Sequence, residues 1–140
     1  MRKFSILCAA LLLGMTSSTI AEDNEDLAKQ LRMSALLDDA EAVETLLDKG
    51  VDVDAANTFG RTALMNAAEN GNILTASILI ARGADVNALS AAQCSPLTMA
   101  AEMGEVEMTA LLLERGADMN RKTRSGWNAL MVSSQYGLLE

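Results

Sequence analysis

The sequence predicts an all-α fold, a solenoid of stacked helix–turn–helix units joined by β-turn and hairpin loops, with about 3.5 repeats. The first observation is a fixed period of 33 residues, at which the segment 62–64 returns as 95–97 and again as 128–130. The second is the extent of the match, since segments 62–87 and 95–120 are identical at 11 of 26 positions. A constant period of this length is typical of stacked units and not of a single globular core.

One unit, residues 57–89, is predicted to contain a turn, two helices and a loop. Thr62 is a good N-cap for a first helix over 63–70, because its hydroxyl can accept a bond from a free backbone N–H. The second helix is predicted over 73–81, and its buried apolar stripe is predicted to consist of Ile73, Ala76, Leu79 and Ile80. Gly83 follows at the position where a left-handed C-cap is favoured.

The other units follow from the same register. Residues 25–56 form a predicted N-terminal capping repeat, 57–89 and 90–122 are two full repeats, and 123–140 is an incomplete fourth. In the capping repeat the first helix is predicted over 24–38, with charged residues that turn one face to water, namely Glu25, Asp26, Lys29 and Arg32. The incomplete repeat has two explanations: the chain is a fragment of a longer protein, or the last repeat is half-formed and exposes apolar surface.

These repeats resemble the ankyrin repeat family. Segments 62–68 (TALMNAA) and 95–101 (SPLTMAA) are similar to its T-P-L-H-x-A-A signature, and 83–88 (GADVNA) matches its closing motif. The chain departs from the pattern where Met65, Thr98 and Met131 replace a histidine that bridges loop and helix, and where Gln93 replaces the turn glycine. These departures predict less tightly held turns. Together with the N-terminus described next, the resemblance is to an exported bacterial ankyrin-repeat protein.

The N-terminus is predicted to be a cleaved signal peptide over residues 1–21. A basic start precedes an apolar run over 4–15 that is too short to span a bilayer, and small residues then lead to a predicted cut between Ala21 and Glu22. The remaining 22–140 form the repeat domain. We therefore expect an exported protein, periplasmic or alternatively extracellular.

The acidity of the chain narrows the class of partner. Removal of residues 1–21 takes away Arg2 and Lys3 and leaves 9 bases against the 19 acids, a net charge of −10. Such a surface repels nucleic acid and anionic lipid headgroups and favours a basic protein partner. We expect no nucleic-acid binding and no membrane insertion after cleavage, while the oligomeric state stays open.

Catalysis is not expected, because the chain contains no histidine and so lacks the commonest general base and transition-metal ligand. Cys94, the one cysteine outside the signal segment, is predicted to be a passive exposed thiol on a hairpin tip. Asp52, Asp54 and Asn57 have a faint calcium-loop spacing, but the required glycine and bidentate glutamate are missing. We therefore predict no enzyme activity, no cofactor and no metal site. Met65, Met99, Met108 and Met131 are expected to be apolar fillers within helices.

The resemblance implies a concave face made of hairpin tips and the exposed ends of the first helices, and this face carries the candidate binding residues. Aromatic and arginine side chains are the types that dominate binding hot spots. The predicted partner-binding residues are Phe59, Arg61, Glu69, Asn70, Glu102, Met103, Arg124, Trp127 and Tyr136. For Trp127 and Tyr136 a structural role, covering the C-terminal end of the stack, is the alternative.

The expected function is an exported, non-catalytic protein–protein interaction module that binds an envelope or secreted protein. It would act as an inhibitor or immunity-type protein, or assist an enzyme. The alternative is a fragment of a larger secreted ankyrin-repeat effector.

Overall fold

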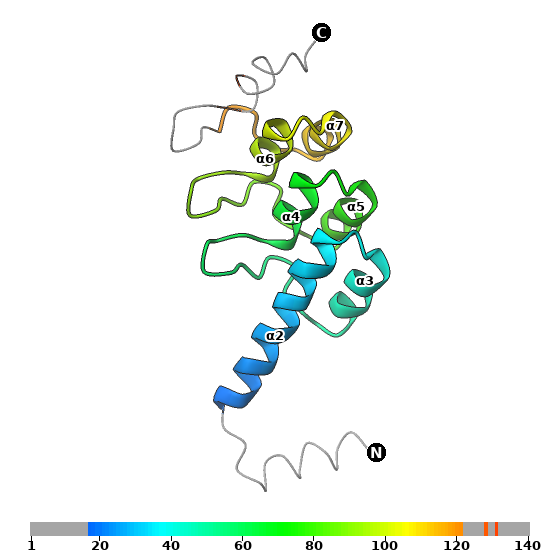
Figure 1. Cartoon of the computed structure of the whole chain (residues 1–140), viewed down its shortest axis with the longest axis vertical. Helices are drawn as coiled ribbons and strands as arrows, with labels where there is room; N and C mark the ends of the chain where they lie inside the picture. Colours follow the sequence, from blue (N-terminus) through cyan, green and yellow to red (C-terminus); the bar gives the residue numbers. More distant parts are fainter. Residues whose placement is uncertain (1–16, 122–127, 129–130, 132–140) are drawn as a thin grey trace, which may run out of the picture.

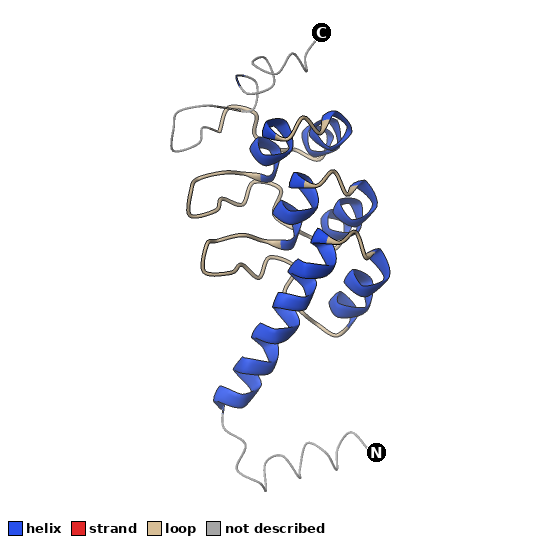
Figure 2. Ribbon diagram, in the orientation of Figure 1, coloured by secondary structure: helices blue, strands red, loops and turns tan. Residues whose placement is uncertain are grey.

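The computed structural model describes residues 17–121, 128 and 131. This part of the chain contains six helices and no strand, which confirms the predicted all-α solenoid. Figure 2 shows these helices in blue, joined by tan loops. The helices are α2 (Ser17–Leu36), α3 (Ala40–Asp48), α4 (Ala63–Glu69), α5 (Ile73–Ala81), α6 (Pro96–Glu102) and α7 (Val106–Glu114).

The helices stack as three antiparallel pairs. Figure 1 shows α2, α4 and α6 in one column and α3, α5 and α7 in a second, with the loops before α4 and α6 projecting away from the second column. Helix α4 packs on α2 on one side and on α6 on the other, and α5 lies between α3 and α7. The two helices of the middle repeat, α4 and α5, therefore bury their apolar surfaces against the repeats on both sides, as a solenoid requires.

The core between the repeats is built from leucines and small alanines. Leu64, Ala67 and Ala68 of α4 have no exposed surface, and their counterparts in α6 are also buried. In α5 the predicted stripe is confirmed at Ala76 and Leu79, whereas Ile73 and Ile80 at its edges are only half-buried. The alanines allow the helices of adjacent repeats to approach closely.

The N-caps of the first helices are confirmed, and the residues that replace the family's histidine make bonds of their own. Thr62 Oγ1 accepts from the backbone N–H of Met65 at 3.3 Å, and Met65 Sδ accepts from the N–H of Thr62 at 3.5 Å. In the next repeat Ser95 Oγ accepts from the N–H of Thr98 at 3.2 Å and lies 3.1 Å from Thr98 Oγ1. Both helix starts therefore satisfy free N–H groups internally.

Helix α2 departs from the sequence prediction in two respects. It begins at Ser17, well before the predicted start at Asn24, and so runs through the predicted cleavage point. No glycine or proline interrupts 17–36, which explains the continuation. Arg32, expected to face water, is 7% exposed and donates to the Ala55 carbonyl at 3.1 Å and to Glu25 at 2.9 Å. The repeat register explains this burial, since Arg32 stands one period before the buried Met65.

Two hairpin turns precede α4 and α6 and lie against each other. In the first, Gly60 N–H donates to the Asn57 carbonyl at 2.9 Å, and Gln93 N–H donates to the Ser90 carbonyl in the second at the same distance. The N–H of Ala91 donates to the Phe59 carbonyl at 2.9 Å and joins the two turns. Gln93 adopts a φ of 65°, close to the 70° of Gly60, so it holds the left-handed conformation without being glycine.

The loops after the second helices form a separate ladder of side-chain bonds. Asp54 Oδ1 accepts from the N–H of Asp85 at 2.9 Å, and Asn87 Oδ1 accepts from the N–H of Asp118 at 2.7 Å. Asp54 and Asn87 stand at the same register position. Each of these loops is therefore tied to the next by the same kind of bond.

Candidate functional site

A groove of about 500 Å³ lies between the two hairpin turns and the ends of α4 and α6. Its lining comprises Phe59, Arg61, Glu69, Ser90, Ala91, Ala92, Cys94, Met99 and Glu102. The structure thus brings together four of the predicted partner-binding residues from two repeats: Phe59, Arg61, Glu69 and Glu102. Ser90 and Met99 belong to the groove but were not among the residues predicted from the sequence.

The remaining predicted residues divide into two groups. Asn70 and Met103 are the C-caps of α4 and α6; both are exposed, but neither lines the groove. Met103 leaves 58% of its surface exposed, and Asn70 Nδ2 donates to the Asn66 carbonyl at 2.8 Å. Arg124, Trp127 and Tyr136 lie outside the described residues.

Phe59 is the large apolar side chain that the groove exposes, with 69% of its surface open to solvent. Its backbone is fixed on both sides, because its N–H donates to Asn57 Oδ1 at 2.9 Å and its carbonyl accepts from Ala91. A rigidly held aromatic residue with little intramolecular packing is a good candidate for a binding anchor.

Arg61 is less available to bind a partner than an unpaired arginine would be. Its guanidinium forms an ion pair with Glu69 and donates from Nε and Nη2 to Asn66 Oδ1, each at 3.2 Å. Asn66 Nδ2 in turn donates to the Arg32 carbonyl of the preceding repeat at 2.9 Å. The charges of Arg61 and Glu69 therefore neutralise each other, and this pair holds the groove wall in place.

Glu102 and Cys94 occupy the other half of the groove. Glu102 is exposed and makes no ion pair with any residue that the structure describes. Cys94 was predicted to be exposed, but it is half-buried, because the hairpin folds back so that its N–H donates to Ser90 Oγ at 3.3 Å. Burial and, second, the nearby Glu102 carboxylate raise the pKa of the Cys94 thiol, while Ser90 and Arg61 lower it. The thiol is thus a poor nucleophile at neutral pH.

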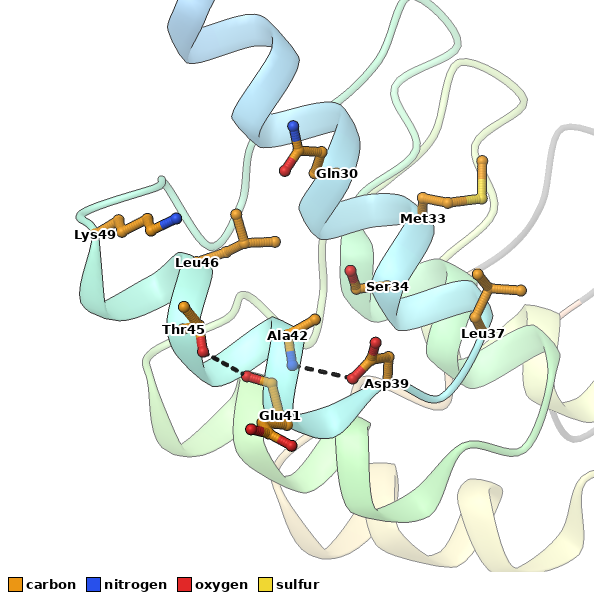
Figure 3. Close-up of a pocket in the computed structure, with 10 residues that line it drawn as sticks. All are labelled: Gln30, Met33, Ser34, Leu37, Asp39, Glu41, Ala42, Thr45, Leu46 and Lys49. Carbon is orange, nitrogen blue, oxygen red and sulfur yellow. Dashed lines mark hydrogen bonds between the residues drawn. The ribbon is translucent and has the colours of Figure 1, made fainter.

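A second cavity of about 500 Å³ lies on the outer face of α2 and α3 (Figure 3). Its side chains are mixed in character: Gln30, Met33, Ser34, Leu37, Asp39, Glu41, Ala42, Thr45, Leu46 and Lys49. Two of the polar atoms form hydrogen bonds in the first turns of α3. Asp39 Oδ1 accepts from the N–H of Ala42 at 3.0 Å, and Thr45 Oγ1 donates to the Glu41 carbonyl at 2.9 Å. None of the predicted partner-binding residues lines it.

Gln30, Ser34 and Thr45 explain the polarity of this outer face. They stand one period before Ala63, Ala67 and Ile78, which pack inside the stack. Polar residues at these positions are expected of a terminal repeat that faces water.

Nothing in the described part of the chain forms a metal site or a membrane span. No group of three or more acidic or cysteine residues there could hold a metal ion, and no helix there is both long and apolar enough to cross a bilayer. The carboxylate and amide oxygens of Asp52, Asp54 and Asn57 instead accept backbone N–H groups of their own and neighbouring loops.

The methionine prediction is confirmed for three of four residues. Met65, Met99 and Met108 are buried. Met131 is 46% exposed, so it does not act as a buried filler.

Comparison with known proteins supports the repeat assignment. The family model described as ankyrin repeats in three copies matches residues 31–123, which is more than half of the chain. No curated protein matches the chain. Ankyrin repeats are protein–protein interaction modules and are typically not catalytic. The fixed period, the stacked helix pairs and this match together show that the chain belongs to the ankyrin repeat family.

Proposed function

We propose that this protein is an exported, non-catalytic interaction module that binds an envelope or secreted protein through the groove between the hairpin turns before α4 and α6. The observation that carries the proposal is Phe59, a rigidly held and largely exposed residue in the same groove as the Glu102 carboxylate. The net charge of −8 for the whole chain favours a basic partner, since complementary charge speeds association. An inhibitory, immunity-type or enzyme-assisting role is consistent with such a site.

The contribution of Phe59 can be measured directly. The Phe59→Ala variant is expected to lose partner affinity by roughly 10- to 100-fold, because truncation of an aromatic anchor typically costs that much. Its thermal midpoint should stay close to that of the parent protein, since the ring is mostly exposed. Isothermal titration calorimetry with a partner recovered from envelope extract provides the measurement.

Leu74 supplies the matched control for this experiment. It lies on α5, outside the groove lining, and is 62% exposed, so Leu74→Ala removes a comparable exposed apolar side chain from another surface. Equal effects of both substitutions, or no effect of Phe59→Ala, would place the binding surface elsewhere.

Export is proposed from the N-terminal sequence. With a C-terminal tag in a bacterial host, the purified protein should begin at Glu22, as read by mass spectrometry or N-terminal sequencing. An Ala21→Tyr substitution puts a bulky residue at the cleavage position and should cause the precursor to accumulate. A protein that keeps Met1 and stays in the cytoplasmic fraction would disprove the assignment.

A second candidate is a segment of a larger secreted ankyrin-repeat effector. Val106, Leu113 and Met119 are exposed to 53, 37 and 40%, whereas residues 73, 80 and 86 at the same register are half-buried under the next repeat. The surface formed by α7 and the loop after it is therefore suited to a further helix pair. Recovery of the complete reading frame separates the two candidates.

A further inference from the structure

The two halves of the groove carry the same acid but not the same partner for it. Glu102 stands one period after Glu69, and Cys94 stands one period after Arg61. In the first half, Arg61 and Glu69 form an ion pair. In the second half the arginine is replaced by cysteine and the glutamate is retained, so the repeat keeps the anion and loses the cation.

The local surroundings make this position suitable for a cation. Arg61 and Glu69 cancel each other, which leaves Glu102 as the uncompensated charge among the groove residues. The negative charge of Glu102 also acts on Cys94, because this carboxylate helps to raise the pKa of the Cys94 thiol. Met99, 6% exposed, stands where the first half has Asn66, so the floor of the second half offers apolar surface in place of an amide.

We propose that the position beside Glu102 and Cys94 receives a lysine or arginine side chain of the protein partner, which takes the place that Arg61 holds in the preceding repeat. The ammonium or guanidinium pairs with the Glu102 carboxylate. The aliphatic stem lies on Met99 and Cys94, as long basic side chains commonly do on apolar surface. An apolar neighbour of that residue in the partner packs on the Phe59 ring. This inference rests on the proposed function and adds the chemistry of the recognised segment.

A partner-free experiment tests the position itself. Cys94→Arg supplies the missing cation from within the chain, and the repeat geometry accommodates it, because the same hairpin position carries Arg61. We expect the thermal midpoint to rise by about 2 °C, as for a modest surface ion pair. The rise should disappear when Glu102→Gln is added and should be absent in Cys94→Ser. A rise that survives Glu102→Gln, or no rise at all, would show that Glu102 does not bind a cation there.

The binding experiment uses a random heptapeptide library displayed on phage, selected against the full chain. Enriched peptides should carry lysine or arginine beside an apolar residue. One enriched peptide is then synthesised, and its Kd is measured by fluorescence polarisation. Glu102→Gln should weaken it about tenfold, and Cys94→Arg at least as much, because the cation position is then filled. Replacement of the peptide's basic residue by norleucine should reproduce the loss.

Two control variants separate charge loss at this position from general effects. Glu107→Gln removes an exposed acid of α7 outside the groove and should leave the Kd within twofold, as should Cys94→Ser. A selected peptide that requires Phe59 but is insensitive to both Glu102→Gln and Cys94→Arg would overturn the cation position and leave the proposed binding face intact. If no peptide is recovered, or if the peptides are insensitive to Phe59→Ala as well, both proposals fail.

Discussion

Replacement of Leu64 by alanine is expected to lower the free energy of unfolding by about 3 kcal/mol. Leu64 has no exposed surface and belongs to α4, which packs against α2 and α6 at once. The shortened side chain leaves a cavity that the neighbouring repeats cannot close without separating from the packed alanines of the core. Urea denaturation followed by far-UV circular dichroism measures the change.

Leu74→Ala is the appropriate comparison for this substitution as well. Its side chain is 62% exposed, so the same chemical change should alter the free energy of unfolding by no more than about 0.5 kcal/mol. A loss below about 1 kcal/mol for Leu64→Ala would mean that the repeats do not share one packed core.

Replacement of Gly60 by alanine is expected to cost about 2 kcal/mol. Gly60 has a φ of +70°, a conformation that is unfavourable for alanine, and an added Cβ would lie 2.9 Å from the backbone nitrogen of Ala91. Because that nitrogen belongs to the bond that joins the two hairpin turns, relief of the contact must separate the turns. The thermal midpoint and the urea midpoint should both fall.

The opposite substitution in the next hairpin provides an internal check. Gln93 has a φ of 65° at the corresponding position, so Gln93→Gly removes strain and should stabilise the protein by about 0.5 kcal/mol. If Gly60→Ala is neutral while Gln93→Gly destabilises, the left-handed turn conformations are not what holds these hairpins.

The sequence allowed accurate prediction of elements that depend on local signals. The second helix over 73–81 has the predicted bounds, and Thr62 caps the first helix as its hydroxyl suggested. The start of α2 was predicted too late, because the predicted start at Asn24 followed the repeat register, whereas no residue in 17–24 breaks a helix.

The groove was predicted in part. The resemblance to the ankyrin repeat family implied that Phe59, Arg61, Glu69 and Glu102 share one face, and the structure joins them in one groove. The pairing of Arg61 with Glu69 was not predicted, since the sequence does not show which exposed charges lie within reach of each other. The replacement of that arginine by Cys94 was visible in the register, as was the burial of Arg32, and applying the repeat to every position would have found both.

The ladder of side-chain bonds between successive loops has a consequence for how such a protein changes its length. Asp54 and Asn87 each reach the loop of the following unit, and the sequence separation between donor and acceptor is the same in both cases. Gain or loss of one whole unit preserves every such spacing, whereas a shorter insertion in a loop displaces it. Gene duplication can therefore extend the recognition surface in steps of one complete repeat, because each added repeat packs through the same core contacts as the others. Natural variants should accordingly differ in length by whole repeats.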